Sequence, residues 1–102
     1  MVVKKSGRMQ VDELSNFYRA IRDDNRITTT HISVYMALFQ LWNEHDFQNP
    51  VMVTRQKIME SGKISGIATY HKAMKDLHDF GYIAYQPSRN PAVMSKVFLS
   101  FL

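Results

Sequence analysis

Apolar residues recur at helical spacing in the N-terminal part of the chain. Four of them stand three or four positions apart and form one stripe: Leu14, Phe17, Tyr18 and Ile21. This spacing predicts an amphipathic helix from about Val11 to Asp24, ended by a polar stretch. Residues 1–10 show no such periodicity, so we expect them to form a flexible basic tail.

A more apolar helix is predicted from about Thr29 to His45, where threonines at 28–30 supply hydroxyls suited to its N-cap. Its apolar positions cover most of the circumference and are Ile32, Val34, Tyr35, Met36, Leu38, Phe39, Leu41 and Trp42. The strip left for solvent consists of Ser33, Ala37, Gln40 and Glu44. A helix with so narrow a polar strip is expected to lie at the centre of its domain.

Shorter elements follow this helix. Residues 51–53 suit a minimal strand, and Thr54 is placed to cap a short helix over about 55–60, which the Ser-Gly pair at 61–62 would end. A polar cap and a second helix then follow over residues 65–80. Two helices joined by a tight glycine-containing turn form the helix-turn-helix pattern.

The C-terminal segment has the composition of a β-hairpin. Gly81 stands where a helix commonly ends in a left-handed conformation, and residues 82–86 are rich in β-formers. Two prolines interrupt the segment at 87–91, and residues 95–102 then alternate, with Val97, Leu99 and Phe101 on one side. The predicted fold class is therefore α+β, mostly α, over a single domain at 11–102.

The helix over 65–80 has two distinct faces. Tyr70, Ala73, Met74 and Leu77 form the apolar face. Ala68, Lys72, Lys75 and Asp79 stand opposite, flanked by Thr69, His71 and Asp76. Free backbone N–H groups at the helix start suit a phosphate, and small residues there allow close approach to base edges. This is typical of a DNA-recognition helix, although an ordinary amphipathic helix with a solvated charged face has the same pattern.

Three stretches carry a family resemblance: 54–59 (TRQKIM), 64–72 (ISGIATYHK) and 77–83 (LHDFGYI). Over residues 28–102 the chain resembles the winged helix-turn-helix family. It is also similar to small stand-alone winged-helix proteins of bacterial mobile elements and to the N-terminal domains of phage-type replication proteins. The resemblance implies three to four helices, a C-terminal β-hairpin wing and a short extra strand. The helix-turn-helix would then span 54–81 and the wing 82–102.

The resemblance also implies roles for single residues. Thr69, His71 and Lys72 would face the major groove, and Arg89 would meet DNA backbone or minor groove. Two positions depart from the family pattern: Ile67 stands where a polar residue is preferred, and His71 where Ser or Arg is common. The expected DNA-binding residues are Thr54, Arg55, Lys63, Ser65, Gly66, Ala68, Thr69, His71, Lys72, Lys75, Arg89 and Lys96.

The distribution of charge agrees with this expectation. Residues 1–50 hold six basic and six acidic side chains, whereas residues 51–102 hold seven basic and three acidic ones. The whole net charge of +4 therefore lies in the half that contains the predicted helix-turn-helix. A pI near 9.5 with clustered charge favours a polyanionic partner.

Other classes of function find little support in the sequence. The chain has no cysteine, which excludes disulfides and thiolate sites and fits a reducing cytoplasm. No apolar run approaches the length of a membrane span, and no secretory signal is expected. His71 and His78 are seven apart, too far for the usual chelating pair, so no metal is expected. We expect no cofactor and no enzymatic activity, because no nucleophile elbow or phosphate loop is present.

The sequence therefore predicts a sequence-specific double-stranded DNA-binding protein, a small bacterial transcriptional regulator. One alternative is an accessory factor for replication, excision or mobilisation of a mobile element. Another is a winged helix that binds only protein. Because one recognition helix contacts few bases, a homodimer on a two-fold site is expected. The first helix, with Phe17 and Tyr18, is the predicted dimer surface.

Overall fold

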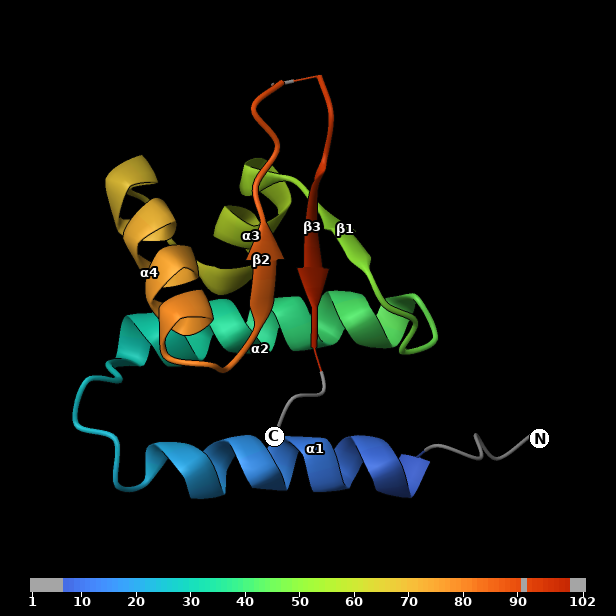
Figure 1. The fold of residues 1–102 in the computed structure, drawn as a ribbon, viewed down its shortest axis with the longest axis vertical. Coiled ribbons are helices and arrows are strands. Elements are labelled where there is room, and N and C mark those ends of the chain that lie inside the picture. Colours follow the sequence, from blue (N-terminus) through green and yellow to red (C-terminus); the bar gives the residue numbers. More distant parts are fainter. Residues whose placement is uncertain (1–6, 91, 100–102) are drawn as a thin grey trace.

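The computed structural model describes residues 7–90 and 92–99, with side chains from residue 12 onward. This part of the chain forms four helices and a small three-stranded antiparallel sheet, so the fold is α+β and mostly helical (Figure 1). The elements are α1 (Gly7–Ile21), α2 (Thr29–Glu44), β1 (Val51–Val53), α3 (Arg55–Gly62), α4 (Ile67–Asp79), β2 (Ala84–Gln86) and β3 (Ser95–Phe98).

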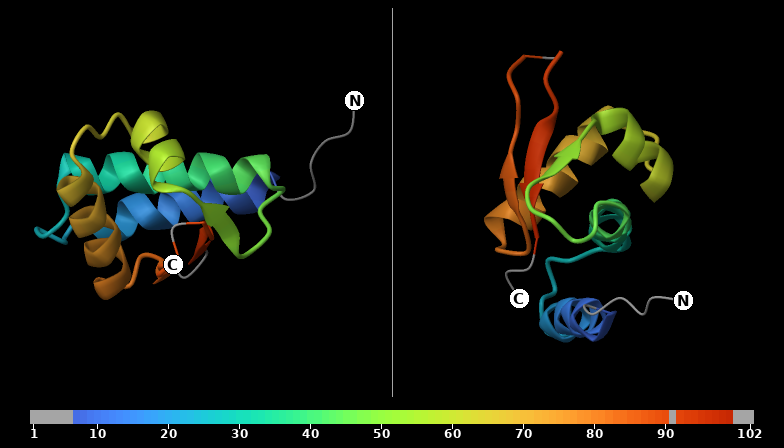
Figure 2. Two further views of the ribbon diagram at one scale, coloured as in Figure 1. Left: turned by 90° about the horizontal axis from the view of Figure 1, so that it is seen from above. Right: turned by 90° about the vertical axis from the view of Figure 1, so that its right-hand side faces the viewer.

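Helix α2 lies in the middle of the molecule, as its apolar pattern predicts. Helix α1 lies on one side of it, and α3, α4 and the sheet lie on the other (Figures 1 and 2). Val34, Leu38 and Trp42 of α2 are buried in the core, together with Met74 and Leu77 of α4. The core therefore fills the space between α2, α4 and the sheet.

One strip of α2 that was predicted to face solvent instead contacts α3. Ala37 is buried, and the Ser33 hydroxyl donates a hydrogen bond to the carbonyl oxygen of Gly62. A Cβ at Gly62 would lie 3.3 Å from the Ser33 carbonyl oxygen, so the backbones approach closely there. The prediction was wrong for these two positions because small residues also allow two helices to approach closely.

Helix α1 is anchored by one aromatic side chain. Phe17 is fully buried, stacks on Tyr35 at a ring-centre distance of 3.7 Å and meets Tyr82 edge to face at 5.7 Å. Its predicted place on a dimer surface is therefore wrong, whereas Tyr18 is 46% exposed. The helix begins at Gly7, inside the predicted tail 1–10. Positions 1–6 of that tail lie outside the described residues.

The helix also ends three residues before the predicted Asp24. The Asp24 carboxylate accepts hydrogen bonds from the backbone N–H and the guanidinium of Arg26, which stabilises a turn in place of a further helical turn.

The turn between α3 and α4 differs in detail from the prediction. Gly62 is the last residue of α3, and the left-handed position after it is occupied by Lys63, with a φ of 59°. The Ile64 N–H then donates to the Met59 carbonyl at 2.9 Å. The close contact with Ser33 explains why glycine stands one residue earlier than a helix end normally requires. Gly81, in contrast, has the predicted positive φ, at 89°.

In the sheet, the last strand lies between the other two, in the order β1-β3-β2. Val97 pairs with Val51 on one side and with Tyr85 on the other. Val97 and Leu99 are buried, which confirms their predicted inward face; Phe101 lies outside the described residues. We call residues 84–98 the hairpin. Its tip points away from α1, to the same end of the molecule as the start of α4 (Figure 1).

Candidate nucleic-acid interface

One face of helix α4 packs against the core, and the opposite face is exposed to solvent. Its predicted apolar face is buried: Tyr70, Ala73, Met74 and Leu77 are each at most 2% exposed. Ala68, Lys72, Lys75 and Asp79 are exposed on the opposite face, and Thr69 and His71 are exposed beside it. The helix starts later than predicted, because Gly66 and not a polar residue occupies the N-cap.

A groove separates this helix from the hairpin. It has a volume of about 930 Å³ and is lined by the start of α3 (Thr54, Arg55), one side of α4 (His71, Lys75, His78) and the hairpin (Tyr85, Arg89). We call it the α4–hairpin groove. Five of the predicted DNA-binding residues lie on it, namely Thr54, Arg55, His71, Lys75 and Arg89. Basic side chains from three separate segments are thus brought together.

The other predicted residues lie outside this groove. Ser65 lines a shallower hollow beside the start of α4, and Lys63 lies in the turn before it. Lys96 is exposed on the central strand β3, where it pairs with Met52 on one side and with Gln86 on the other. As the neighbour of the buried Val97, it points to the opposite face of the sheet. It therefore lies on the sheet face away from the core. Gly66, Ala68, Thr69 and Lys72 belong to the start and the outer face of α4.

Two of the residues predicted to contact DNA bond to other groups of the protein. The Thr54 hydroxyl accepts a hydrogen bond from the Lys57 N–H at 3.2 Å and so caps α3, as predicted. The Lys75 ammonium donates to Asp79 at 2.5 Å, and this hydrogen bond raises the pKa of Lys75. Both side chains of the Lys75–Asp79 pair are exposed, so water competes for each charge and the pair stabilises the helix little.

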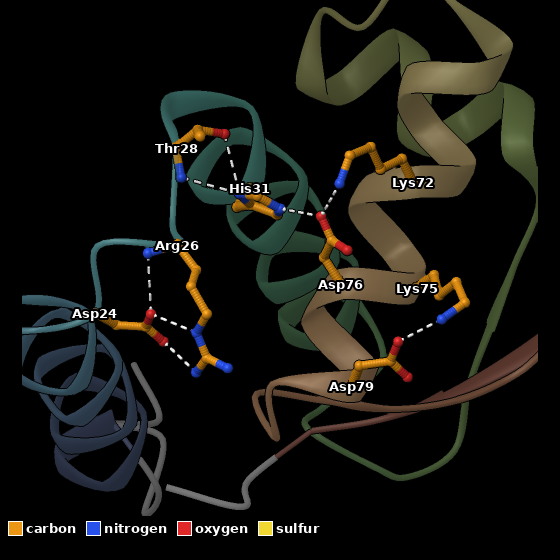
Figure 3. A network of polar contacts seen from close by, with 8 residues as sticks. All are labelled: Asp24, Arg26, Thr28, His31, Lys72, Lys75, Asp76 and Asp79. Carbon is orange, nitrogen blue, oxygen red and sulfur yellow. Dashed lines mark hydrogen bonds and ion pairs between the residues drawn. The ribbon is translucent and has the colours of Figure 1, made fainter.

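Lys72 belongs to a chain of polar contacts that reaches α2 (Figure 3). Its ammonium donates to Asp76 at 2.8 Å, and the same carboxylate oxygen lies 2.9 Å from Nε2 of His31. The Nδ1 atom of His31 accepts from the Thr28 backbone N–H at 2.9 Å. Because Nδ1 is an acceptor, the ring hydrogen lies on Nε2 and is donated to Asp76. Lys72 and His31 together hold the pKa of Asp76 below its usual value.

The contact between His31 and Asp76 was absent from the predictions. No role was predicted for His31, which the structure buries as the third residue of α2, where its ring accepts a hydrogen bond from the backbone N–H of the cap residue. A helix start of the form Thr-x-x-His was the available signal, since a side-chain acceptor three residues after a cap commonly bonds back to it. Its partner on α4 lies 45 residues away in sequence, beyond any local pattern.

A second polar cluster fixes the end of α4 and the entry to the hairpin. The Tyr82 hydroxyl donates to Asp24 at 2.7 Å, and the Arg26 guanidinium, bonded to the same carboxylate, lies 4.0 Å from the ring centre of Phe80. The bonds from Arg26 and Tyr82 hold the pKa of Asp24 well below its usual range. Burial, and then the contact with Asp24, raise the pKa of Tyr82 to about 12. Asp24 and Arg26, in the turn after α1, therefore contact the segment that joins α4 to β2 and fix its position.

His78 connects the two walls of the α4–hairpin groove directly. Its Nδ1 atom accepts a hydrogen bond from the Tyr85 backbone N–H at 3.0 Å. Tyr85 belongs to β2, an edge strand, so its N–H is satisfied by a side chain of α4. This bond fixes the hairpin against the helix and makes His78 a positioning residue, a role that was not predicted for it.

Within the described residues, no group of three or more His, Asp or Glu side chains is placed to hold a metal ion. None of the helices in that part of the chain is long and apolar enough to cross a membrane. No family model, curated protein or solved structure matches this chain.

Proposed function

We propose that this chain is a winged helix-turn-helix protein that binds double-stranded DNA and acts as a small transcriptional regulator. In this proposal α3 and α4 are the helix-turn-helix, α4 enters the major groove and the hairpin is the wing. The single observation that carries the proposal is the α4–hairpin groove, which gathers Arg55, Lys75 and Arg89 beside an exposed helix face.

The shape of this end of the molecule supports the proposed binding mode. The start of α4 and the hairpin tip project to the same end (Figure 1). A helix of 13 residues is about 20 Å long, and a major groove about 12 Å wide admits one helix. With α4 in the major groove of DNA, the hairpin would lie over a neighbouring phosphate backbone. Arg55, at the start of α3, and Arg89, in the hairpin, would then contact phosphates of that strand.

The charge around α4 supports the same proposal. Asp79 pairs with Lys75 in an exposed position, and a phosphate can replace the carboxylate as the partner of the ammonium without breaking a buried contact. Lys72 has the same freedom, because its side chain is 76% exposed although Asp76 is largely covered. The lysines are therefore held near the helix surface in the absence of DNA and remain available to it.

Binding is tested by fluorescence anisotropy with a labelled duplex pool of random sequence, titrated at several salt concentrations. The double variant Arg55→Ala/Arg89→Ala is expected to bind about tenfold or more weakly near 100 mM salt. The slope of log affinity against log salt should also fall by roughly two, since each lost phosphate contact lowers it by about one.

Arg22→Ala is the control for loss of a basic residue outside the groove, because Arg22 is exposed in the turn directly after α1 and does not line the groove. Equal losses in Arg22→Ala and in the double variant would show that the interface lies elsewhere. If the unaltered protein binds no duplex at about 50 mM salt, DNA binding itself is wrong. Crosslinking of bound DNA in cells then tests the regulatory role, which requires sites at promoters and not at replication origins or element ends.

A further inference from the structure

The start of α4 exposes an apolar side chain that the core does not use. Ile67 is the first residue of the helix and is 50% exposed. Beside it lies a shallow hollow of about 460 Å³, whose apolar lining comes from Ile67, Ile64 and Met59. Single exposed apolar residues are common on protein surfaces, but Ile67 stands at the tip of the proposed reading helix, where it would meet the base edges.

Within the first turn of α4, from Gly66 to Thr69, polar side chains are few. Gly66 and Ala68 offer no polar side-chain atom, and the Thr69 Oγ1 lies back over the cap, only 3.1 Å from where a Cβ of Gly66 would stand. Lys72 and Lys75, further along, are paired with aspartates. The first turn therefore exposes two apolar side chains, those of Ile67 and Ala68.

We infer that this first turn recognises the 5-methyl group of thymine in the major groove, with Ile67 as the specificity-determining residue. The inference rests on the proposed DNA binding. Thymine is the one standard base that presents a methyl group on that edge, and apolar side chains distinguish it by contact. Lys63 precedes the turn, and Arg55 lines the same hollow as Ile67 together with the acidic Glu60, so basic groups outnumber acidic ones there and fit this partner.

The test compares thymine with uracil, which pairs identically and lacks only the methyl group. A duplex is first enriched from a random pool by binding to the protein. It is then copied with either thymidine or deoxyuridine nucleotides, and the affinities of both copies are measured. The unaltered protein should bind the uracil copy about fourfold more weakly for each methyl group that Ile67 covers, the effect of exposing one buried carbon. Single replacements along the duplex should confine the loss to one or two positions.

For the Ile67→Ala variant, replacing thymine by uracil at those positions should leave the affinity unchanged. Met52→Ala is the matched control, since Met52 is also an exposed apolar residue but lies on β1, and it should keep the unaltered ratio. If the duplex binds but uracil has no effect, or if the effect persists in Ile67→Ala, the inference is wrong and DNA binding stands. If no duplex binds, the proposed function and the inference are both wrong.

Discussion

At the scale of single residues, two of the positions with positive φ differ in whether the residue there carries a Cβ. Lys63 has a φ of 59° and carries a side chain, whereas Gly81 has a φ of 89° and carries none. A residue with a Cβ is strained in this region by about 1–2 kcal/mol relative to glycine. The chain thus tolerates strain at the α3–α4 turn, where the side chain is a proposed DNA contact.

Lys63→Gly is therefore expected to raise the free energy of unfolding by about 1 kcal/mol and to weaken DNA binding. Gly81→Ala is expected to lower it by about 1–2 kcal/mol, through the backbone alone, because nothing lies within 4 Å of the added Cβ. Urea denaturation of both variants checks the signs, and anisotropy checks the binding. A less stable Lys63→Gly variant would mean that the lysine makes a stabilising contact at that turn.

The acidic residue Asp24 gives a prediction that depends on pH. Its pKa is lowered in the folded state, so the stability it contributes is fully present above its unfolded pKa of 3.8 and is lost as pH falls toward the folded value. Asp24→Asn should therefore be less stable than the unaltered protein at pH 7, and the difference should shrink below about pH 4. Denaturation curves at pH 7, 5 and 3 measure it.

The exposed neighbour Asp23 provides the comparison for this experiment, with Asp23→Asn expected to change stability little at any of these pH values. A difference between Asp24→Asn and the unaltered protein that stays constant from pH 7 to 3 would contradict the assigned role of the carboxylate. The bonds from Arg26 and Tyr82 would then act independently of its charge.

At the scale of elements, helix α4 balances its basic residues with its own aspartates. Asp79 faces the same solvent-exposed side as Lys75 and, in the proposed complex, would lie near the phosphates. Its carboxylate both neutralises the lysine and repels the DNA. The helix is therefore less cationic than its lysine count implies, which limits non-specific binding.

The variant Asp79→Asn should consequently bind duplex DNA more tightly, by about threefold at 100 mM salt, and with a steeper dependence on salt. Anisotropy measures both quantities. Asp12→Asn makes the same charge change on an exposed position of α1, across the molecule, and should leave affinity nearly unchanged. Equal gains in the two variants would point to net charge and not to a local interface.

The elements themselves were largely predictable from local sequence. Helical spacing located α2, α3 and α4 to within two residues at each end, and β1 was placed as predicted. Contacts between distant segments were not predictable in this way. The pairing of His31 with Asp76, and that of Asp24 with Tyr82, join residues 45 and 58 positions apart. Likewise, the strip of Ser33 and Ala37 looked solvent-facing because nothing local reveals the helix that covers it.

In the candidate site too, local features were predictable and contacts between distant segments were not. The exposed face of α4 was predictable from its periodicity, and five expected residues do line the α4–hairpin groove. Lys96 was expected as a DNA contact on the return strand of the wing, and it lies on the outer face of the sheet, away from this groove. The partners of Lys72 and Lys75 were visible as i, i+4 pairs, but the sequence does not tell whether such pairs form.

At the scale of the whole molecule, two polar clusters and one aromatic stack hold the proposed DNA-binding end to the rest. Asp24 bonds to Tyr82 just before the hairpin, and His31 bonds to Asp76 on α4. Phe17 contacts Tyr35 and Tyr82 and thereby fastens α1 to the same frame. Helix α1, which carries the exposed Tyr18, lies on the opposite side of α2 from α4 (Figure 1). It therefore does not cover the proposed DNA-binding end.

The order β1-β3-β2 has a consequence for synthesis on the ribosome. The strand formed last in the chain pairs with both of the others, so neither β1 nor β2 has a partner until residues 95–99 have been made. Val97 and Leu99 also complete the core at that moment. The nascent protein should therefore remain incompletely packed until these residues leave the exit tunnel, and then fold in one late step.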